Sequence, residues 1–125
     1  MKEKERKPED LLPLTAAVFH ILLALADSER HGYGIMQEIA QRTDGTMRMG
    51  PGTLYGSIKR MLADRLIEES DERPDPEMDD ERRRYYRLTD FGRRVVQAEA
   101  RRLEQVVRIA QSKRLLASPE TRGGA

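Results

Sequence analysis

The sequence predicts a mainly α-helical α+β fold, a winged helix-turn-helix followed by a long C-terminal helix. Three observations predict it. Helical patterns occupy residues 11–65 in three segments, two strand-like segments flank an acidic, proline-containing stretch within residues 66–88, and a long amphipathic segment follows Thr89. Three helices, a two-stranded hairpin and a further helix, in that order, are typical of a winged helix-turn-helix.

The first two helices are predicted from apolar patterning and turn residues. Residues 11–27 are apolar on nearly all sides, which is typical of a helix buried between two layers. Residues 28–32 are polar and contain glycine, so they predict a turn. A second helix follows at about residues 34–42.

The third helix is predicted at residues 54–65. Gly50-Pro51-Gly52 stops any helix before Thr53, and Thr53 is a good N-cap for the segment that follows. Apolar residues recur at helical spacing on one side of this segment, namely Leu54, Ile58, Met61 and Leu62. We expect that side to face the core.

The wing is predicted as a hairpin. A strand begins at residues 66–67, the acidic stretch 71–80 forms a loop, and residues 82–88 alternate as a returning strand does. The alternation places Tyr86 and Leu88 on the inner face. The outer face carries Arg83, Tyr85 and Arg87.

The last helix is predicted to begin after Thr89, a good N-cap, with Asp90 favourably placed in its first turn. It extends to about residue 116. We therefore expect four segments, which are a disordered tail at 1–10, the winged helix-turn-helix domain at 11–89, the C-terminal helix at 90–116 and a second disordered tail at 117–125.

Composition excludes several classes of protein. The chain has no Cys, which excludes disulfides, thiolate nucleophiles and Cys-ligated metals. His20 and His31 lack an acidic ligand motif, and no nucleophile–base pair is visible, so we expect no metal, no cofactor and no catalytic site. The apolar run at residues 11–26 is too short and too interrupted to span a membrane. Since the mixed-charge N-terminus is not typical of a signal peptide, we expect a cytoplasmic protein without a membrane partner.

The outward side of the third helix favours DNA binding. Its residues are small near the N-terminus and basic further along, namely Thr53, Gly56, Lys59, Arg60 and Ala63. Small side chains let a helix approach the major groove, and cations neutralise phosphates. Tyr55 lies on the flank, where its hydroxyl is expected to reach a phosphate. The alternative is a solvated face on which Gly56 has no role.

Four short motifs follow one another along the chain. They are HGYGI at residues 31–35, GTLY at 52–55, LADRLI at 62–67 and YRLTDFG at 86–92. With these motifs the sequence resembles the PadR family of bacterial transcriptional regulators over about residues 14–108. The resemblance implies dimeric DNA binding, usually repression, often relieved by a small molecule or a cellular stress.

The first motif has a predicted structural role. HGYG lacks the Lys-Ser/Thr of a phosphate-binding loop and follows no strand, so nucleotide binding is not expected. We expect His31 to cap or buttress the second helix and Tyr33 to pack in the core, with ligand binding by Tyr33 as the alternative.

The tip and the base of the wing carry opposite charge. The tip, residues 73–81, carries five acidic residues, which DNA phosphates would repel. We expect it to stay in solvent or to pair with arginines. Arg83 and Arg87, at the base, point outward and are predicted to contact phosphates. The alternative is that the arginines only neutralise the neighbouring acids.

Heptad spacing in the last helix predicts a homodimer. The apolar seam consists of Val96, Ala100, Leu103, Val107 and Ala110, widened by Val95, Val106 and Ile109. Two heptads are too few for a free coiled coil but suffice against the apolar first helix of a partner. That helix is expected to contribute Leu14, Val18, Ile21 and Leu22. Residues 90–116 are therefore predicted as a C-terminal dimerisation helix, and packing within a monomer is the alternative.

Together these features predict a sequence-specific, DNA-binding transcriptional regulator, a homodimeric repressor on a pseudo-palindromic operator in double-stranded DNA. The resemblance leaves a small-molecule effector open. The predicted DNA-binding residues are Arg48, Gly52, Thr53, Tyr55, Gly56, Ser57, Lys59, Arg60, Arg83 and Arg87. The alternative function is a winged-helix protein-interaction module without specific DNA binding, which the net charge of only +1 and the acidic wing favour.

Overall fold

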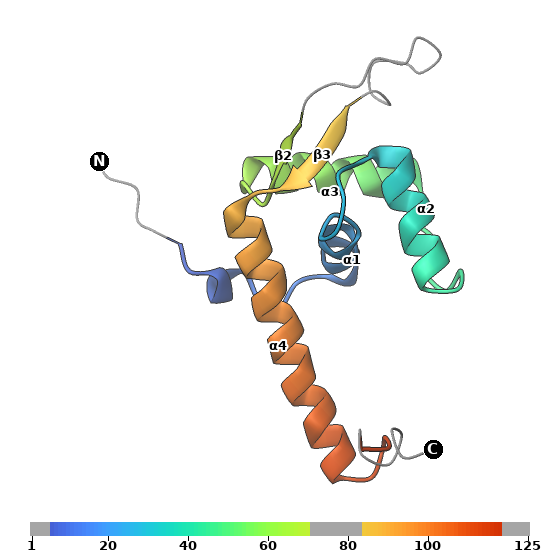
Figure 1. The fold of residues 1–125 in the computed structure, drawn as a ribbon, viewed down its shortest axis with the longest axis vertical. Coiled ribbons are helices and arrows are strands. Elements are labelled where there is room, and N and C mark those ends of the chain that lie inside the picture. The colour runs from blue at the N-terminus through green and yellow to red at the C-terminus, as the bar shows by residue number, and fades with distance from the viewer. Residues whose placement is uncertain (1–5, 71–83, 119–125) are drawn as a thin grey trace.

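A computed structural model describes residues 6–70 and 84–118 of the chain (Figure 1). Its elements, in order, are the 3₁₀ helix η1 (Pro8–Leu11), α1 (Ala16–Ala24), β1 (Arg30–His31), α2 (Gly32–Arg42), α3 (Pro51–Ala63), β2 (Ile67–Glu69), β3 (Tyr85–Leu88) and α4 (Asp90–Ser112). This arrangement confirms the predicted mainly α-helical winged fold with a long last helix.

The wing strands belong to a three-stranded antiparallel sheet in the order β1-β3-β2. Arg30 pairs with Tyr86 across β1 and β3, and Ile67 pairs with Leu88 across β2 and β3. The predicted hairpin is confirmed in β2 and β3, but β1 replaces part of the turn expected at residues 28–32. A strand of two residues has no alternation for a sequence pattern to detect.

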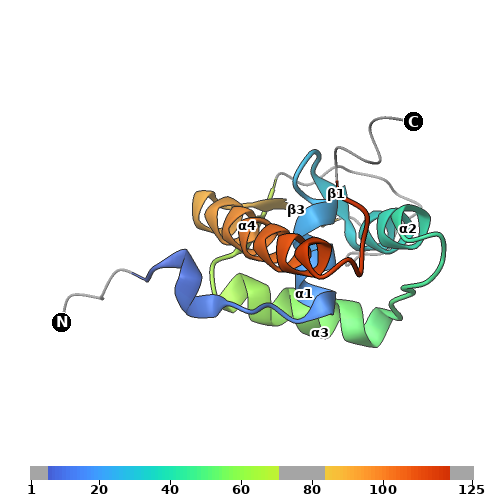
Figure 2. The same ribbon diagram turned by 90° about the horizontal axis from the view of Figure 1, so that it is seen from below.

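The core forms around α1, which contacts α2, α3 and α4. Figure 2 shows α1 between α4 and α3. Its apolar character on nearly all sides thus reflects packing on several neighbours at once. The fully buried side chains of the core include Ile21, Leu22, Ile35, Ile39, Leu54, Met61, Ile67 and Val95.

Side chains cap the start of three helices. The Thr15 hydroxyl accepts from the Val18 N–H at 3.2 Å, and the Thr89 hydroxyl accepts from the Gly92 N–H at 2.9 Å. His31 Nδ1 accepts from the Gly34 N–H at 2.9 Å, which confirms its predicted capping role. Each cap satisfies one of the backbone donors that a helix leaves unpaired at its first turn.

Several predicted boundaries are wrong. Pro8–Leu11 forms η1 and contacts α4, whereas the sequence predicted a disordered tail there. The first helix begins only at Ala16, after its Thr15 cap, and ends at Ala24. Helix α3 begins at Pro51, because a proline at the first helical position loses no hydrogen bond, so Gly50 rather than Thr53 is the N-cap. Helix α4 ends at Ser112 instead of residue 116.

The YRLTDFG motif fastens α4 to the wing. A Cβ on Gly92 would overlap the carbonyl oxygen of Leu66, and it would lie 2.8 Å from the carbonyl carbon. Thr89 donates its hydroxyl to the carbonyl oxygen of Arg65 at 2.6 Å. The glycine and threonine therefore let the first turn of α4 sit directly on the chain that enters β2.

Candidate nucleic-acid interface

Helix α3 has the two faces that the sequence predicts. Leu54, Ile58 and Met61 are at most 2% exposed and belong to the core. On the opposite side, Thr53, Lys59 and Arg60 are exposed. The inward packing thus fixes which side of α3 is available to a partner.

The two cations of this face are uncompensated. Within the described residues, neither Lys59 nor Arg60 has an ion pair or a side-chain hydrogen bond. A Cβ placed on Gly56 would meet no heavy atom within 4 Å, so the backbone is open to close approach there. Free cations beside an uncrowded helix backbone suit a phosphate-lined groove.

Ser57 is not part of this face. It is 2% exposed and lies on the buried side of α3, so its predicted place near the bases is wrong. Thr53, Gly56 and Lys59 follow one another at intervals of three residues and lie on the outward side of α3. Ser57 is the residue after Gly56, and it lies on the buried side with its neighbour Ile58.

Tyr55 joins the GTLY and HGYG motifs. A Cβ on Gly32 would overlap the Tyr55 hydroxyl and lie 2.7 Å from Cζ of that ring. The absence of a side chain at Gly32 therefore lets Tyr55 pack directly on the first residue of α2. The half-buried Tyr55 links the two helices of the helix-turn-helix.

Arg48 lies in the segment between α2 and α3 and is exposed. Its guanidinium folds toward the turn at Gly45, where a Cβ would stand 3.1 Å from Nη2. Gly45 has a φ of +76°, a left-handed conformation that favours glycine. The Arg48 guanidinium therefore lies beside the turn that follows α2.

The arginines of the wing base are paired with carboxylates. Arg87 points outward as predicted, but its Nε lies 2.8 Å from Glu68 and its Nη1 lies 3.6 Å from Glu29. The hydrogen bond to Glu68 raises the pKa of Arg87 above its usual value. Nη1 of Arg84 lies 3.7 Å from Oε2 of Glu69.

These pairs match the alternative in which wing arginines neutralise neighbouring acids. Glu68 stands directly opposite Arg87 in the β2–β3 register. Arg83 and the acidic tip at residues 73–81 lie outside the described residues, so their predicted roles stay predictions.

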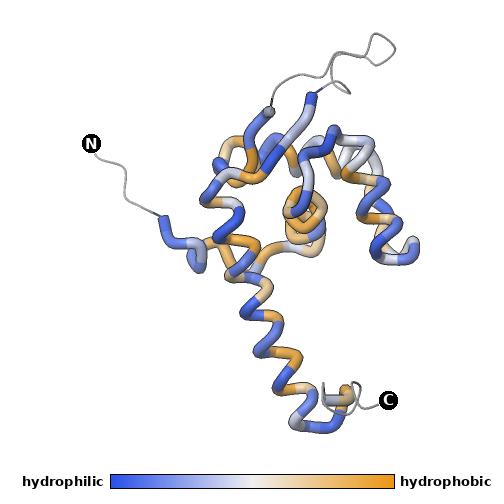
Figure 3. Tube along the Cα trace, in the orientation of Figure 1, coloured by the Kyte–Doolittle hydropathy of each residue, from blue (hydrophilic) through white to orange (hydrophobic). Residues whose placement is uncertain are grey.

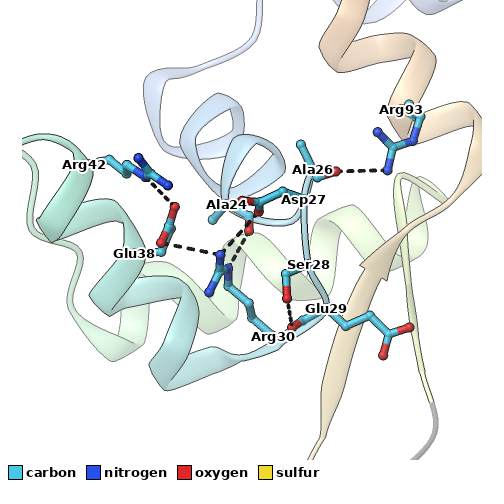
Figure 4. A network of polar contacts seen from close by, with 9 residues as sticks. All are labelled: Ala24, Ala26, Asp27, Ser28, Glu29, Arg30, Glu38, Arg42 and Arg93. Atoms are coloured by element: carbon cyan, nitrogen blue, oxygen red, sulfur yellow. Dashed lines mark hydrogen bonds and ion pairs between the residues drawn. The ribbon is translucent and has the colours of Figure 1, made fainter.

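A polar network sets the position of α2 (Figure 4). Arg30 donates from Nε to the carbonyl oxygen of Ala24 at 2.7 Å. Its Nη2 lies 3.3 Å from Oδ1 of Asp27 and 3.5 Å from Oε1 of Glu38. Glu38 also accepts from Arg42 at 2.8 Å. Arg30 thereby ties the end of α1 to the middle of α2, on which α3 depends for its placement.

The predicted dimer seam divides into a buried and an exposed part. Ile21 and Leu22 are 0% exposed and Val96 is 5% exposed, so these side chains fill the core of their own protomer and their assignment to an interface is wrong. Further along α4, Val107 is 41% exposed. Residues 100–112 of α4 are mostly exposed and are called the free half of α4. Figure 3 shows apolar and polar residues alternating along it. Its large exposed apolar side chains are Val106, Val107 and Ile109, with Leu115 and Leu116 beyond the helix end.

A buried carboxylate lies at the middle of α4, where the sequence did not predict one. Glu99 is 2% exposed, accepts from Arg102 at 2.6 and 3.1 Å, and accepts from the Leu14 N–H at 3.0 Å. The Arg102 hydrogen bonds lower the pKa of Glu99 despite its burial. The only sequence signal was the Glu-Arg spacing of three residues, which is common on exposed helices.

Comparison with known proteins identifies the family. Residues 21–98 match the model of the "Transcriptional regulator PadR-like family". The chain belongs to the PadR family. Transcriptional regulator Rv3488 of Mycobacterium tuberculosis is 38% identical over 93 residues, which cover 74% of this chain and 80% of that protein.

Solved structures of other proteins share the fold. A PadR family transcription regulator of Clostridium difficile R20291 matches with a TM-score of 0.65 at 21% identity, covering 78% of this chain and 97% of the other. RosR of H. salinarum matches with a TM-score of 0.59 at 27% identity, covering 91% and 88%. As a PadR-family transcriptional regulator, the protein belongs to a group whose members bind DNA and are generally not enzymes. Among the described helices, none is both long and apolar enough to cross a membrane.

Proposed function

We propose that this PadR-family regulator is a homodimeric repressor that binds a pseudo-palindromic operator with the outward face of α3. The observation that carries the proposal is the pair of uncompensated cations, Lys59 and Arg60, beside the open backbone at Gly56. Such a face adds affinity through phosphates and admits the helix to a major groove.

The contacts divide into two groups by chemistry. Gly52, Thr53 and Gly56 lie nearest the bases, because they are small and occupy the N-terminal turns of α3. Cationic side chains contact phosphates, with Tyr55 on the flank. These cations are Arg48, Lys59, Arg60, Arg83 and Arg87.

The free half of α4 supplies the dimer contact. Val107 and Ile109 are 41% and 56% exposed, which is unusual for a stripe of large apolar side chains in a soluble chain. A second copy would cover the stripe, together with Ala100, Leu103 and Ala110 of α4 and the half-buried Leu14 and Val18 of the N-terminal part. A two-fold dimer then presents two α3 helices about 34 Å apart, one helical turn of DNA.

Family membership supports two finer features that we include in the proposal. A small-molecule effector relieves the repression, and the protein works in the cytoplasm where its operator is. The alternative, a winged-helix protein-interaction module, draws support from the carboxylates that neutralise Arg84 and Arg87.

The test is the salt dependence of DNA binding. Lys59→Ala is compared with Lys113→Ala, which removes the same charge at the far end of α4. Fluorescence anisotropy with a random duplex at several salt concentrations gives the slope of log affinity against log salt. Lys59→Ala lowers the slope by about one unit per protomer, or about two for the dimer, while Lys113→Ala leaves it unchanged.

Equal slopes for Lys59→Ala and the parent would remove Lys59 from the phosphate contacts and contradict the observation on which the proposal rests. Absence of DNA binding by the parent at low salt, with its dimer intact, would favour the protein-interaction alternative.

A further inference from the structure

Tyr33 is the one residue of the HGYGI motif whose position contradicts its expected role. The sequence predicted that it packs in the core, yet it is 53% exposed. Within residues 6–70 and 84–118, its hydroxyl has no hydrogen-bond partner. Its hydroxyl is therefore available to donate to an acceptor outside the described part of the chain.

Neighbouring rings brace this side chain. The His31 ring stacks on Tyr33, with centroids 6.5 Å apart and planes inclined by 23°. His31 in turn meets Tyr85 edge-on at 5.2 Å, and its Nδ1 is committed to the Gly34 N–H. The Tyr33 ring therefore has a rigid support on one side and solvent on the other.

Tyr33 lies where α2, α3 and the wing meet. His31 pairs with Tyr85 in the sheet, which places the first turn of α2 beside the wing strand β3. Gly32, the residue before Tyr33, packs against Tyr55 of α3. Figure 1 shows α2 starting at the edge of the molecule from which β2 and β3 project.

We propose that Tyr33 is a further DNA-backbone contact, whose hydroxyl donates a hydrogen bond to a phosphate oxygen beside the groove that α3 enters. This inference rests on the proposed function. A phosphate oxygen is an acceptor suited to a free tyrosine hydroxyl, and tyrosine is among the side chains that contact phosphates in DNA complexes. The ring support from His31 means that little side-chain freedom is lost on binding.

The contact has a signature that separates it from the lysine and arginine contacts. Tyrosine is uncharged, so it releases no counterion when it meets a phosphate. Loss of Tyr33 should therefore weaken binding without changing the salt slope, whereas loss of Lys59 changes both.

The experiment compares Tyr33→Phe, Tyr33→Ala and Gln41→Ala by fluorescence anisotropy at several salt concentrations. Two duplexes are used, one of random sequence and one from the DNA upstream of the protein's own gene, called the promoter duplex. Tyr33→Phe removes only the hydroxyl. Gln41→Ala removes an exposed polar side chain two turns further along α2 and serves as the control. Thermal unfolding of each variant verifies that the fold is kept.

Tyr33→Phe should weaken binding to both duplexes about 5- to 10-fold, with the parent's salt slope, and Tyr33→Ala at least as much. Gln41→Ala should bind as the parent does. Parental affinity of Tyr33→Phe, together with a reduced slope for Lys59→Ala, would overturn the inference and leave the proposed function standing. A parent that fails to bind any duplex would overturn both.

Discussion

Gly56→Ala should stabilise the protein and weaken its DNA binding at the same time. The residue lies inside α3, and an added Cβ would meet no atom of the protein within 4 Å. Alanine is favoured over glycine within a helix by about 0.5–1 kcal/mol, so the melting temperature should rise by roughly 2–4 °C.

The same methyl group would stand between α3 and the groove. Added volume in a closely packed contact costs about 1–3 kcal/mol, which corresponds to a loss of roughly 5- to 150-fold in affinity. Thermal unfolding by circular dichroism gives the first quantity, and anisotropy with the promoter duplex gives the second. A rise in melting temperature without any loss of affinity would refute the argument that Gly56 allows close approach to DNA.

Three further predictions concern the scaffold. Gly92→Ala should lower the melting temperature by roughly 10 °C, since its Cβ would overlap the Leu66 carbonyl; an unchanged melting curve would refute that close contact. Glu99→Gln should cost about 1–2 kcal/mol in urea unfolding at pH 7. Because the native pKa of Glu99 is lowered by Arg102, its stabilisation is present above the unfolded-state value of about 4.3 and is lost as the pH falls through the native value, so parent and variant should converge in acid. A constant difference between them would contradict this. Ile109→Asp places a charge in the proposed dimer contact, so the molar mass measured by light scattering should fall from about twice 14.4 kDa toward 14.4 kDa. A dimer that persists in this variant would place the interface elsewhere.

Local signals in the sequence were sufficient for most of the fold. The apolar period of α3 predicted its buried side, and Thr89 and His31 predicted caps that the structure contains. The alternation of β3 placed Tyr86 inward and Arg87 outward, as found. These features depend on neighbours within about four residues, which a local pattern records.

Features that depend on distant chain segments were missed. A heptad pattern identifies an apolar stripe but not what covers it, so Val96 and Val107 looked equivalent although one lies in the core and the other in solvent. The pairing of Arg87 with Glu68 requires the strand register across the wing. Ser57 is different, because it lies three residues after Leu54 and four before Met61, so the local helical period already places it on the buried side where it is found.

The position of Tyr33 depended on tertiary structure in the same way. An aromatic residue within an apolar-looking motif is usually buried. Here the pairing of β1 with β3 leaves the first turn of α2 at the rim of the sheet, so the ring remains 53% exposed.

The claim that DNA binds across the outward face of α3 can be examined residue by residue, by titrating ¹⁵N-labelled protein with a promoter duplex and following backbone amide chemical shifts. The largest shifts are predicted at Thr53, Gly56, Lys59 and Arg60, with smaller ones at Tyr33 and none along the free half of α4. Shifts confined to α4, or no shifts on α3 at saturating DNA, would contradict the claim.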